Sequence, residues 1–315
     1  MGRHHARVYA ELPDVTLVGV ADTDESRAAA VASDNGTEPL RQHDLLSAVD
    51  VVSIATPTAY HYPIAQAALD AGVATLVEKP FVGDLDHGRE LIDHARDVDV
   101  PLGVGHVERF NPAVEAVAEI VADLDVIAVT ARRLGPPPDR TVRTSVAEDL
   151  MVHDIDVVRS LLDADVTAIS AMGARSNRYV DAHLRFDDGV VAGLTASRLT
   201  QQKVRELSIT ATDCRVVVDY IDRSVRIHRR SVPEYVEGRG DVHYRHEGIV
   251  ERPAVDRGEP LRRELSAFVD AVREGVDPPV TAEDGLAACS IARRIDRLAR
   301  DGPNATAQVE GVLRP

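Results

Sequence analysis

The chain has 315 residues, a formal net charge of −16 and 44% hydrophobic residues, which is enough apolar surface for a buried core and excludes a disordered chain. It has no Trp and only 3% aromatic residues, and its acidity repels a phosphate backbone, so nucleic-acid binding is disfavoured. Its two cysteines, Cys214 and Cys289, lie far apart and fit neither a disulfide framework nor a zinc site, and no apolar run reaches the length of a membrane span.

The first third of the chain alternates short apolar runs with helix-like stretches. We predict strands at 15–21, 49–55, 73–77 and 100–105, and helices at 4–12, 25–33, 63–71, 86–97 and 112–122. Alternation of this kind, with strands that are apolar throughout, is typical of a doubly wound α/β domain. Its parallel sheet carries helices on both faces.

The pattern changes near residue 125. A strand at 125–131 and a helix at 146–162 are followed by closely spaced strands at 166–172, 182–186, 190–196, 206–212, 215–220 and 224–228. Residues 231–258 are polar and rich in Gly, His and Arg, so we predict a long loop there, and helices at 261–273 and 282–298 end the pattern. This part of the chain predicts an α+β domain with a mostly antiparallel open sheet.

Lysine is almost absent from this chain. Of the 36 basic residues only Lys79 and Lys203 are lysines, and Lys79 stands in Glu78-Lys79-Pro80, directly after the strand predicted at 73–77. Arginine replaces lysine at most surface sites, but it cannot release or share a proton as an amine can. Lys79 is therefore a candidate for a chemical role, with a solvated surface lysine as the alternative. We expect Lys203 to be exposed.

The start of the chain lacks a feature that a dinucleotide-binding sheet requires. Such a sheet opens with a strand, a Gly-rich turn and a helix that faces the pyrophosphate, whereas here Gly2 leads straight into a helix. The next strand ends at Asp22, where the residue that binds the ribose hydroxyl in an NAD site belongs. We therefore expect the natural protein to start upstream, with a first strand and two further glycines. The alternative is a degenerate site that no longer binds dinucleotide.

Four segments, taken in order, resemble the GFO/IDH/MocA oxidoreductase family. They are V-A-D-T-D-E-S-R (20–27), A-T-P-T-A-Y-H (55–61), A-G-V-A-T-L-V-E-K-P (71–80) and E-D-L-M-V-H-D-I-D (148–156). The resemblance runs from Gly2 to the last helix and departs from the family at the absent first strand and glycines, which puts cofactor affinity in doubt. It implies a Rossmann-like dinucleotide-binding domain at 1–122, incomplete at its N-terminus. It also implies a substrate-binding and oligomerisation domain at 123–315, with the last helices packing back on the first domain.

Two further segments narrow the resemblance. V-G-H-V-E-R-F-N-P-A (104–113) and R-R-L-G-P-P-P-D-R (132–140) are similar to members that oxidise nucleotide sugars, of the UDP-N-acetylglucosamine 3-dehydrogenase type. Inositol or simple sugar dehydrogenases of the same family remain alternatives. A non-catalytic dinucleotide-binding regulator is a third alternative, which the missing glycines favour slightly.

Oxidation of a secondary hydroxyl needs a base for the proton and a nicotinamide for the hydride. Asp149 and His153 are four residues apart, so on a helix they share one face. We assign His153 as general base, Asp149 as the residue that orients it or the substrate, and Lys79 as the hydrogen-bond donor to the reacting oxygen. The family resemblance supports these three positions, and it implies a cis peptide bond between Lys79 and Pro80.

Asp22 favours NAD over NADP because its carboxylate repels a 2′-phosphate. The other positions assigned to the cofactor are Gly2, Arg27, Thr56, Pro57, His61, Glu78 and Lys79. The positions assigned to the substrate are His106, Arg109, Asn111, Arg133 and Asp154. Arg132, Arg133, Arg140 and Arg143 flank a proline run and are candidates for an anion clamp, although clusters form easily in a chain with so many arginines.

We expect a small-molecule sugar or nucleotide-sugar substrate and no nucleic-acid or membrane partner. A soluble, cytoplasmic protein without a metal site is the default expectation for this composition. The open sheet of the second domain implies a homodimer or homotetramer, by resemblance to the family. High acidity with two lysines further suggests a halophile, whose excess surface charge maintains solubility.

Overall fold

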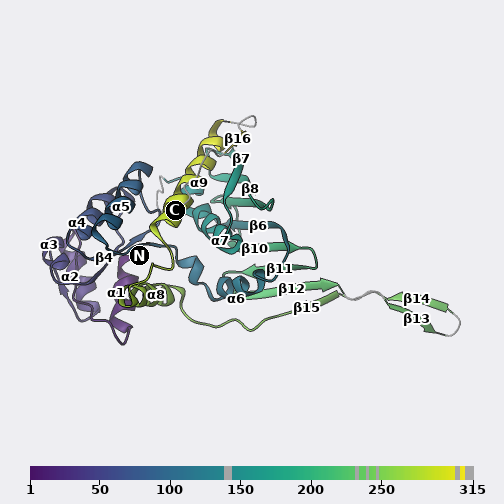
Figure 1. Cartoon of the computed structure of the whole chain (residues 1–315), viewed down its shortest axis with the longest axis horizontal. Coiled ribbons are helices and arrows are strands. Elements are labelled where there is room, and N and C mark those ends of the chain that lie inside the picture. The colour runs from purple at the N-terminus through teal and green to yellow at the C-terminus, as the bar shows by residue number, and fades with distance from the viewer. Residues whose placement is uncertain (138–143, 231–233, 239–240, 246–247, 302–305, 309–315) are drawn as a thin grey trace. The chain divides into compact units, whose positions relative to one another are not determined.

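The computed structural model describes the chain except for residues 138–143, 231–233, 239–240, 246–247, 302–305 and 309–315. The chain falls into two compact units, and Figure 1 colours the chain by residue number from the N-terminus to the C-terminus. Unit 1 comprises Met1–Phe110 and Gly258–Ser290, and unit 2 comprises Asn111–Arg257 and Ile291–Arg314. The domain boundary at 122–123 stays a prediction from the change in sequence pattern.

Unit 1 contains the parallel strands predicted from the sequence. β3 (Val51–Ile54), β4 (Ala74–Glu78) and β5 (Leu102–Gly105) form one parallel sheet in that order. β1 (Gly19–Val20) and β2 (Glu38–Pro39) pair in parallel in a separate small sheet. All five residues of β4 are buried, as expected for a parallel strand that is covered on both faces. The Rossmann-like parallel sheet is thus confirmed.

Helices cover both faces of the β3-β4-β5 sheet. On one face, α4 (His61–Asp70), α5 (Leu85–Val98) and the first part of α9 (Ala282–Asp301) pack over Val77 and Val104. On the other face, α1 (Gly2–Glu11) and α8 (Pro260–Glu274) pack over Ala74 and Leu76. α2 (Glu25–Asp34) and α3 (Gln42–Leu46) complete the α-helices described in this unit.

Unit 2 is built on a broad sheet. Its nine described strands are ordered β15-β12-β11-β10-β6-β9-β8-β7-β16, and among them only β6 and β9 pair in parallel. The central strands are β6 (Val126–Leu134), β7 (Val166–Ala174), β8 (Tyr179–Phe186), β9 (Val191–Ser197), β10 (Val204–Ala211), β11 (Cys214–Asp219) and β12 (Ser224–Arg230). β16 (Thr306–Gln308) pairs with β7 at one edge. The mostly antiparallel sheet predicted from the sequence is confirmed.

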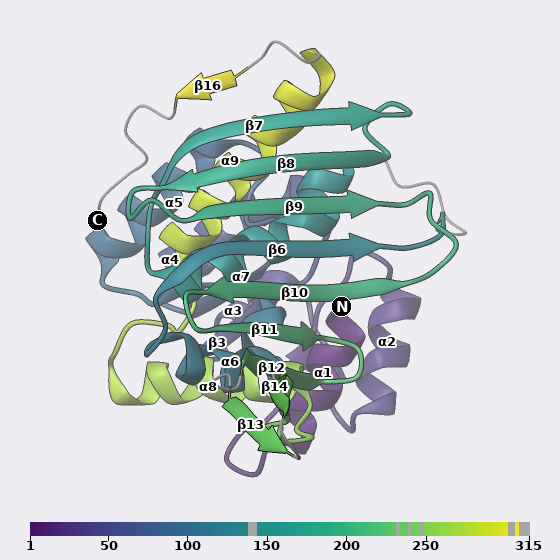
Figure 2. The same ribbon diagram turned by 90° about the vertical axis from the view of Figure 1, so that its right-hand side faces the viewer.

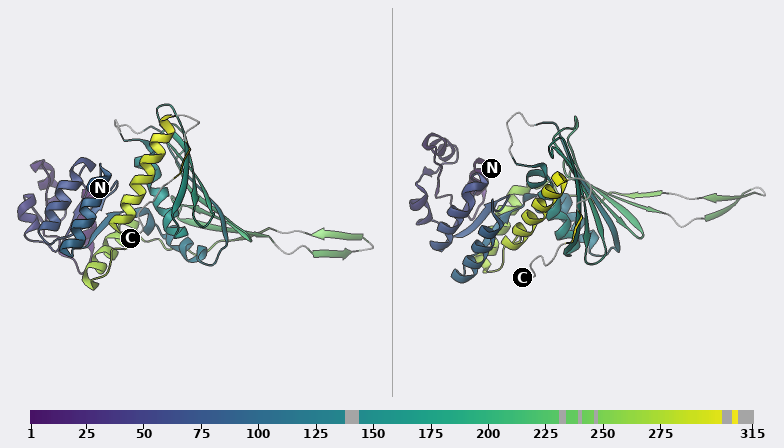
Figure 3. Two further views of the ribbon diagram at one scale, coloured as in Figure 1. Left: turned by 45° about the horizontal axis from the view of Figure 1, so that its top comes forward. Right: turned by 90° about the horizontal axis from the view of Figure 1, so that it is seen from above.

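One face of this sheet carries helices, and the other face is broad and open. α6 (Pro112–Val121) packs on β11 and β12, and α7 (Val152–Leu162) packs on β6 and β9. Figure 2 looks onto the opposite face, and Figure 3 shows the sheet from the side. Among the residues that the structure describes, no helix has the length and apolar character needed to cross a membrane.

The loop predicted over residues 231–258 is wrong. The segment contains β13 (Glu234–Gly238), β14 (Asp241–Arg245) and β15 (Gly248–Glu251). β13 and β14 pair with each other as a hairpin, and β15 extends the large sheet beside β12. The overall polarity of the segment favoured a loop, but the alternating residues on either side of Gly238-Arg239-Gly240 have a hairpin pattern.

Candidate active site

Lys79 directly follows β4, at the carboxyl end of the middle strand of the unit 1 sheet. This is the edge at which open α/β sheets bind ligands. Lys79 is half-buried, and the peptide bond that joins it to Pro80 is cis, as expected. Glu78, the last residue of β4, is 6% exposed. Its neighbour on β5 is Gly105, where an added Cβ would lie 3.3 Å from the Glu78 carboxyl carbon, so glycine leaves the space that this carboxylate occupies.

The Glu78 carboxylate lies between α1 and the backbone of Lys79. Its Oε1 is 2.9 Å from Nε2 of His5, a residue of α1 that is 3% exposed. Its Oε2 accepts a hydrogen bond of 3.2 Å from the backbone N–H of Lys79. A carboxylate in this position stays in place because it is paired on both sides. The position places Glu78 beside Lys79 rather than out in solvent.

His61 is 1% exposed and begins α4. Its ring nitrogens lie within hydrogen-bond distance of backbone carbonyl oxygens only, Thr56 on one side and Pro80 and Phe81 on the other. Thr56 and Pro57, which precede it, are exposed at the end of β3. Of the three cofactor positions predicted in this segment, Thr56 and Pro57 are exposed, and His61 is buried with its ring against backbone carbonyl groups.

The remaining cofactor positions lie around the ends of β1 and α1. Asp22 follows β1, and its carboxylate accepts from the backbone of Asp24 at 2.9 Å and pairs with Arg27 at 3.2 Å. The Ser26 hydroxyl and the backbone N–H of Arg27 hold the pKa of Asp24, the N-cap of α2, below its usual range. Gly2 is the first residue of α1, and an added Cβ there would meet only Ala55 Cβ, at 3.7 Å.

This group of residues fits the adenosine end of a dinucleotide. A carboxylate at the carboxyl end of a parallel strand matches a ribose hydroxyl pair, and the N-terminus of α1 matches an anion. Gly2 does not form a tight cradle, because the space above it would accept a side chain at ordinary contact distance.

Two predicted substrate residues follow β5. His106 is fully buried directly after the strand. Arg109 pairs with Asp284 of α9 at 3.1 Å, with its side chain 14% exposed. Both residues lie in unit 1, at the same sheet edge as Lys79.

Asp149, in unit 2, lies in a π-helical turn, Ala147–Met151, that precedes α7. The helix predicted over 146–162 is therefore a π-helical turn followed by α7, and the four-residue spacing between Asp149 and His153 crosses that junction. The Asp149 carboxylate pairs with Arg198, which follows β9, and Arg198 also donates to the carbonyl of Thr144 at 2.8 Å. His153 is half-buried in the first turn of α7. π-turns of this kind are frequent at functional sites.

Arg133 and Asp154, both predicted to bind substrate, bind each other. Arg133 of β6 donates to Asp154 of α7 through Nε at 2.9 Å and through Nη2 at 2.8 Å, and both residues are at most 3% exposed. The guanidinium also lies over the ring of Tyr220, at 5.4 Å from its centroid. This buried, bidentate pair joins β6 to α7 on the helix-covered face of the sheet.

The proposed arginine clamp is only partly within the described residues, since Arg140 and Arg143 lie outside them. Arg132 is exposed whereas its neighbour Arg133 is buried, because successive residues of a strand point to opposite faces. These two arginines cannot close on one anion. Asn111 is 4% exposed and caps α6, accepting from Ala113 N–H at 3.1 Å and donating to the Tyr220 carbonyl at 3.2 Å.

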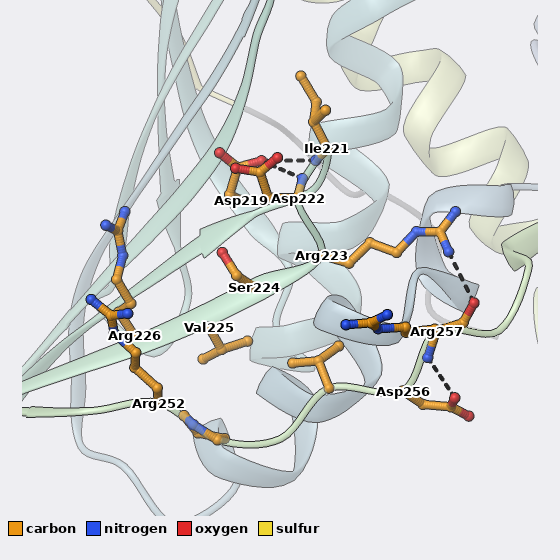
Figure 4. A pocket seen from close by; sticks show the side chains of 12 residues that line it. Asp219, Ile221, Asp222, Arg223, Ser224, Val225, Arg226, Arg252, Asp256 and Arg257 are labelled. Carbon is orange, nitrogen blue, oxygen red and sulfur yellow. Dashed lines mark hydrogen bonds between the residues drawn. The ribbon is translucent and has the colours of Figure 1, made fainter.

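A separate pocket of about 600 Å³ lies in unit 2, around the β11–β12 turn and the segment after β15 (Figure 4). Four arginines and three aspartates line it: Arg223, Arg226, Arg252, Arg257, Asp219, Asp222 and Asp256. It contains none of the residues predicted from the sequence. In the part of the chain that the structure describes, no three His, Cys, Asp or Glu side chains are grouped so as to hold a metal ion.

Two family models match this chain. Residues 1–106 match the oxidoreductase family with an NAD-binding Rossmann fold, and residues 125–217 match the GFO/IDH/MocA C-terminal domain. A curated relative, UDP-N-acetylglucosamine 3-dehydrogenase of Acidithiobacillus ferrooxidans, is 32% identical over 281 residues, which are 86% of this chain and 85% of the relative. The chain belongs to the GFO/IDH/MocA oxidoreductase family.

Other family members are similar over most of their length. The solved structure of the same Acidithiobacillus enzyme superposes with a TM-score of 0.85 at 28% identity, covering 95% of this chain and 94% of that one. Inositol 2-dehydrogenase of Rhizobium meliloti is 28% identical over 93% of this chain and 92% of its own. D-xylose 1-dehydrogenase (NADP⁺) 2 of Haloferax volcanii is 28% identical over 89% and 87%. These relatives are named dehydrogenases that act on sugars, inositols and nucleotide sugars.

Two polar residues of the site were missed in the sequence. His5 looked like one of two adjacent histidines in a surface helix, and only its position on the buried side of α1 shows it beside Glu78. Arg198 is one arginine among many, 49 residues from the aspartate that it pairs with. The signal for His5 was the helical period, since it lies three and four residues before the apolar Val8 and Tyr9. No local signal pointed to Arg198.

Proposed function

We propose that this chain is an NAD-dependent dehydrogenase that oxidises a secondary hydroxyl of a nucleotide sugar, with UDP-N-acetylglucosamine as the first substrate to test. The observation that carries the proposal is the position of Lys79 at the carboxyl end of β4, preceded by a paired Glu78 and followed by Pro80. The similarity to the Acidithiobacillus enzyme over 86% of the chain supports the nucleotide-sugar class.

Lys79, Asp149 and His153 are the proposed catalytic residues. The Lys79 amine donates a hydrogen bond to the reacting oxygen and stabilises the developing alkoxide. His153 takes the hydroxyl proton as general base, and the oxygen becomes a carbonyl as the carbon gives up its hydride. The nicotinamide supplies the hydride acceptor when the dinucleotide is bound. Arg198 holds the Asp149 carboxylate, so Asp149 orients its neighbours as a fixed negative charge.

The proposed cofactor is NAD rather than NADP. Asp22 supports this choice because a carboxylate after the strand accepts from a ribose hydroxyl and repels a 2′-phosphate. Arg27 beside it offsets part of that charge. Gly2, Arg27, Thr56, Pro57 and Glu78 complete the proposed cofactor side, with His61 acting through the backbone that it holds.

His106 and Arg109 are the proposed substrate residues of unit 1, at the sheet edge that also carries Lys79. Asn111, Arg133 and Asp154 stay predicted substrate residues. The hydrogen bonds described for these residues join elements of unit 2 to one another. A direct contact with substrate would therefore involve other atoms of the same side chains.

The direct test follows NADH absorbance with UDP-N-acetylglucosamine, myo-inositol and free hexoses, each with NAD and with NADP. Turnover with the UDP-sugar and NAD supports the proposal. Turnover with inositol or hexose alone establishes the second candidate, an inositol or simple sugar dehydrogenase, which the similarity to the Rhizobium enzyme favours. Thermal stabilisation by NAD without turnover on any of these compounds would instead support the non-catalytic regulator.

The proposed setting is the cytoplasm, as a homodimer or homotetramer that associates through the open sheet face of Figure 2. Exposed apolar side chains lie on that face by strand register, among them Met172 (60% exposed), Tyr179 and Val191. Exposed apolar groups on one face are typical of an interface. Sedimentation equilibrium tests this: a monomer at all concentrations contradicts it, and Met172→Lys should weaken association.

A further inference from the structure

His61 contacts the backbone of the two residues that directly follow Lys79. The His61 Nδ1 is 3.1 Å from the carbonyl oxygens of both Pro80 and Phe81, the two residues after Lys79. Its Nε2 is 2.9 Å from the carbonyl oxygen of Thr56, in the loop after β3. One imidazole thus bridges the loops that follow two neighbouring strands.

All three partners of the ring are hydrogen-bond acceptors. A carbonyl oxygen cannot donate, so each of these contacts needs an N–H on the ring. A neutral imidazole donates on one side only, whereas the doubly protonated ring donates on both sides at once. In the neutral ring only one of the two sides is hydrogen-bonded to backbone, and the residue is 1% exposed.

The residue on the other side of Lys79 is held as well. The Glu78 carboxylate accepts from the Lys79 backbone N–H at 3.2 Å and pairs with buried His5 at 2.9 Å. Two buried histidines from different helices thus act on the two sides of Lys79. His5 of α1 pairs with the carboxylate that accepts from the Lys79 N–H, and His61 of α4 contacts the carbonyl oxygens of the two residues after Lys79. Burying such groups costs free energy unless they are paired. An apolar residue at position 61 would avoid that cost but would leave the carbonyl oxygens of Pro80 and Phe81 without this donor.

We propose that His61 is the positioning residue for Lys79. Its ring holds the backbone from which the amine extends, so that the amine stays at the reacting oxygen; His5 supports it from the opposite side through Glu78. This inference rests on the proposed catalytic role of Lys79. Elements that fix a catalytic group to within a fraction of an ångström are expected to affect the rate more than substrate binding.

The scarcity of lysine allows a direct measurement without substrate or cofactor. Competitive acylation followed by mass spectrometry compares the Lys79 amine with the exposed Lys203 in the same molecule, and arginine does not react. For His61→Gln, we expect the labelling ratio of Lys79 to Lys203 to rise about fivefold, the population change that loss of one ordinary hydrogen bond produces. The matched control is His94→Gln, since His94 of α5 pairs with Asp70 on the exposed surface. An unchanged ratio in folded His61→Gln overturns the proposal.

A second measurement covers the case in which His61→Gln does not fold. Selective ¹⁵N-lysine labelling of the unaltered protein gives two backbone amide signals, one from each lysine. We expect the Lys79 amide to show the order parameter of rigid backbone, above that of Lys203, and slow hydrogen exchange. A Lys79 amide as mobile as that of Lys203 contradicts a held loop.

Turnover separates this inference from the proposed function. At saturating cofactor and sugar, we expect His61→Gln to lower kcat about tenfold with little change in the KM for the sugar. In a Lys79→Ala background the same substitution should cause no further loss, because its effect passes through the amine. Independent losses that multiply overturn the positioning role while Lys79 stays catalytic. Full turnover of Lys79→Ala instead overturns the proposed function, and the labelling ratio still decides whether His61 holds the loop.

Discussion

At the scale of single residues, Lys79 carries the sharpest expectation. Removal of a hydrogen-bond donor to a developing oxyanion lowers kcat about a hundredfold to a thousandfold. We expect the kcat of Lys79→Ala to be lower than that of the unaltered enzyme by this factor. Lys79→Arg should also fail to restore full activity, because a guanidinium keeps its charge but has a different shape and shares no proton. Lys203→Ala is the matched control, since Lys203 is exposed in unit 2. Steady-state kinetics decide the matter, and a fully active Lys79→Ala contradicts the assigned mechanism.

The buried pair of Arg133 and Asp154 carries an expectation about stability. With Arg133→Ala, Asp154 keeps a buried charge without its bidentate partner, which costs about 3–5 kcal/mol in the free energy of unfolding. Replacing both residues by apolar ones, as in Arg133→Met with Asp154→Leu, should cost much less, because no uncompensated charge remains. Arg96→Ala, which breaks the exposed pair with Glu283, should cost about 1 kcal/mol or less. Guanidinium denaturation compares the three; equal losses for the single and double variants would contradict this account.

At the scale of elements, α1 is tied to β3 by a hydroxyl pair. Tyr9 Oη lies 2.7 Å from Ser53 Oγ, and burial, offset in part by that hydrogen bond, raises the Tyr9 pKa to about 12. The unfolded chain loses this proton near pH 10, before the folded chain does, so the unfolded state binds fewer protons in that interval. The contribution of the neutral tyrosine is fully present below pH 10 and is lost as pH rises to about 12, amounting to roughly 2–3 kcal/mol.

The matching variant is Tyr9→Phe. It removes the titrating group, so the fall in its unfolding free energy between pH 10 and 12 should be smaller than in the unaltered chain by that amount. Urea denaturation at a series of pH values measures the difference. Tyr60→Phe is the control, because the Tyr60 side chain lies exposed on the surface. Parallel pH profiles for all three proteins would mean that Tyr9 does not titrate with folding.

Helices and strands whose apolar residues repeat with a clear period were predictable from the sequence. Features that depend on contacts with distant parts of the chain were not. The strand predicted over 73–77 and the helix predicted over 86–97 appear as β4 and α5 within a few residues. In each of them the apolar residues recur with a period that fits one type of element with its apolar side buried. The π-turn before α7 has no local signal and was not predicted, although the helix that contains it was. Asp22 was proposed as a site residue because it follows a predicted strand, and Lys79 because it follows another strand in a chain with two lysines. The partners His5 and Arg198 depend on which helix or strand packs beside them, and that is set by tertiary packing.

At the scale of the whole molecule, charge is the dominant property. The chain has 52 acidic and 36 basic residues, and acid side chains crowd a surface with almost no lysine. At low ionic strength like charges repel across the Debye length of about 30 Å, whereas at 1 M salt that length falls to about 3 Å. Repulsion within the folded chain therefore opposes compaction most strongly in dilute buffer.

We therefore expect the folded state to depend on salt. Dialysis from molar KCl into dilute buffer should lower the Tm measured by circular dichroism, and the protein should unfold or aggregate at the lowest ionic strength. Sucrose at low salt is the control, because an excluded osmolyte strengthens burial without screening charge. Recovery by KCl but not by sucrose assigns the effect to charge. A chain that stays folded, with an unchanged Tm, from molar to dilute salt would show that its acidity is not a salt adaptation.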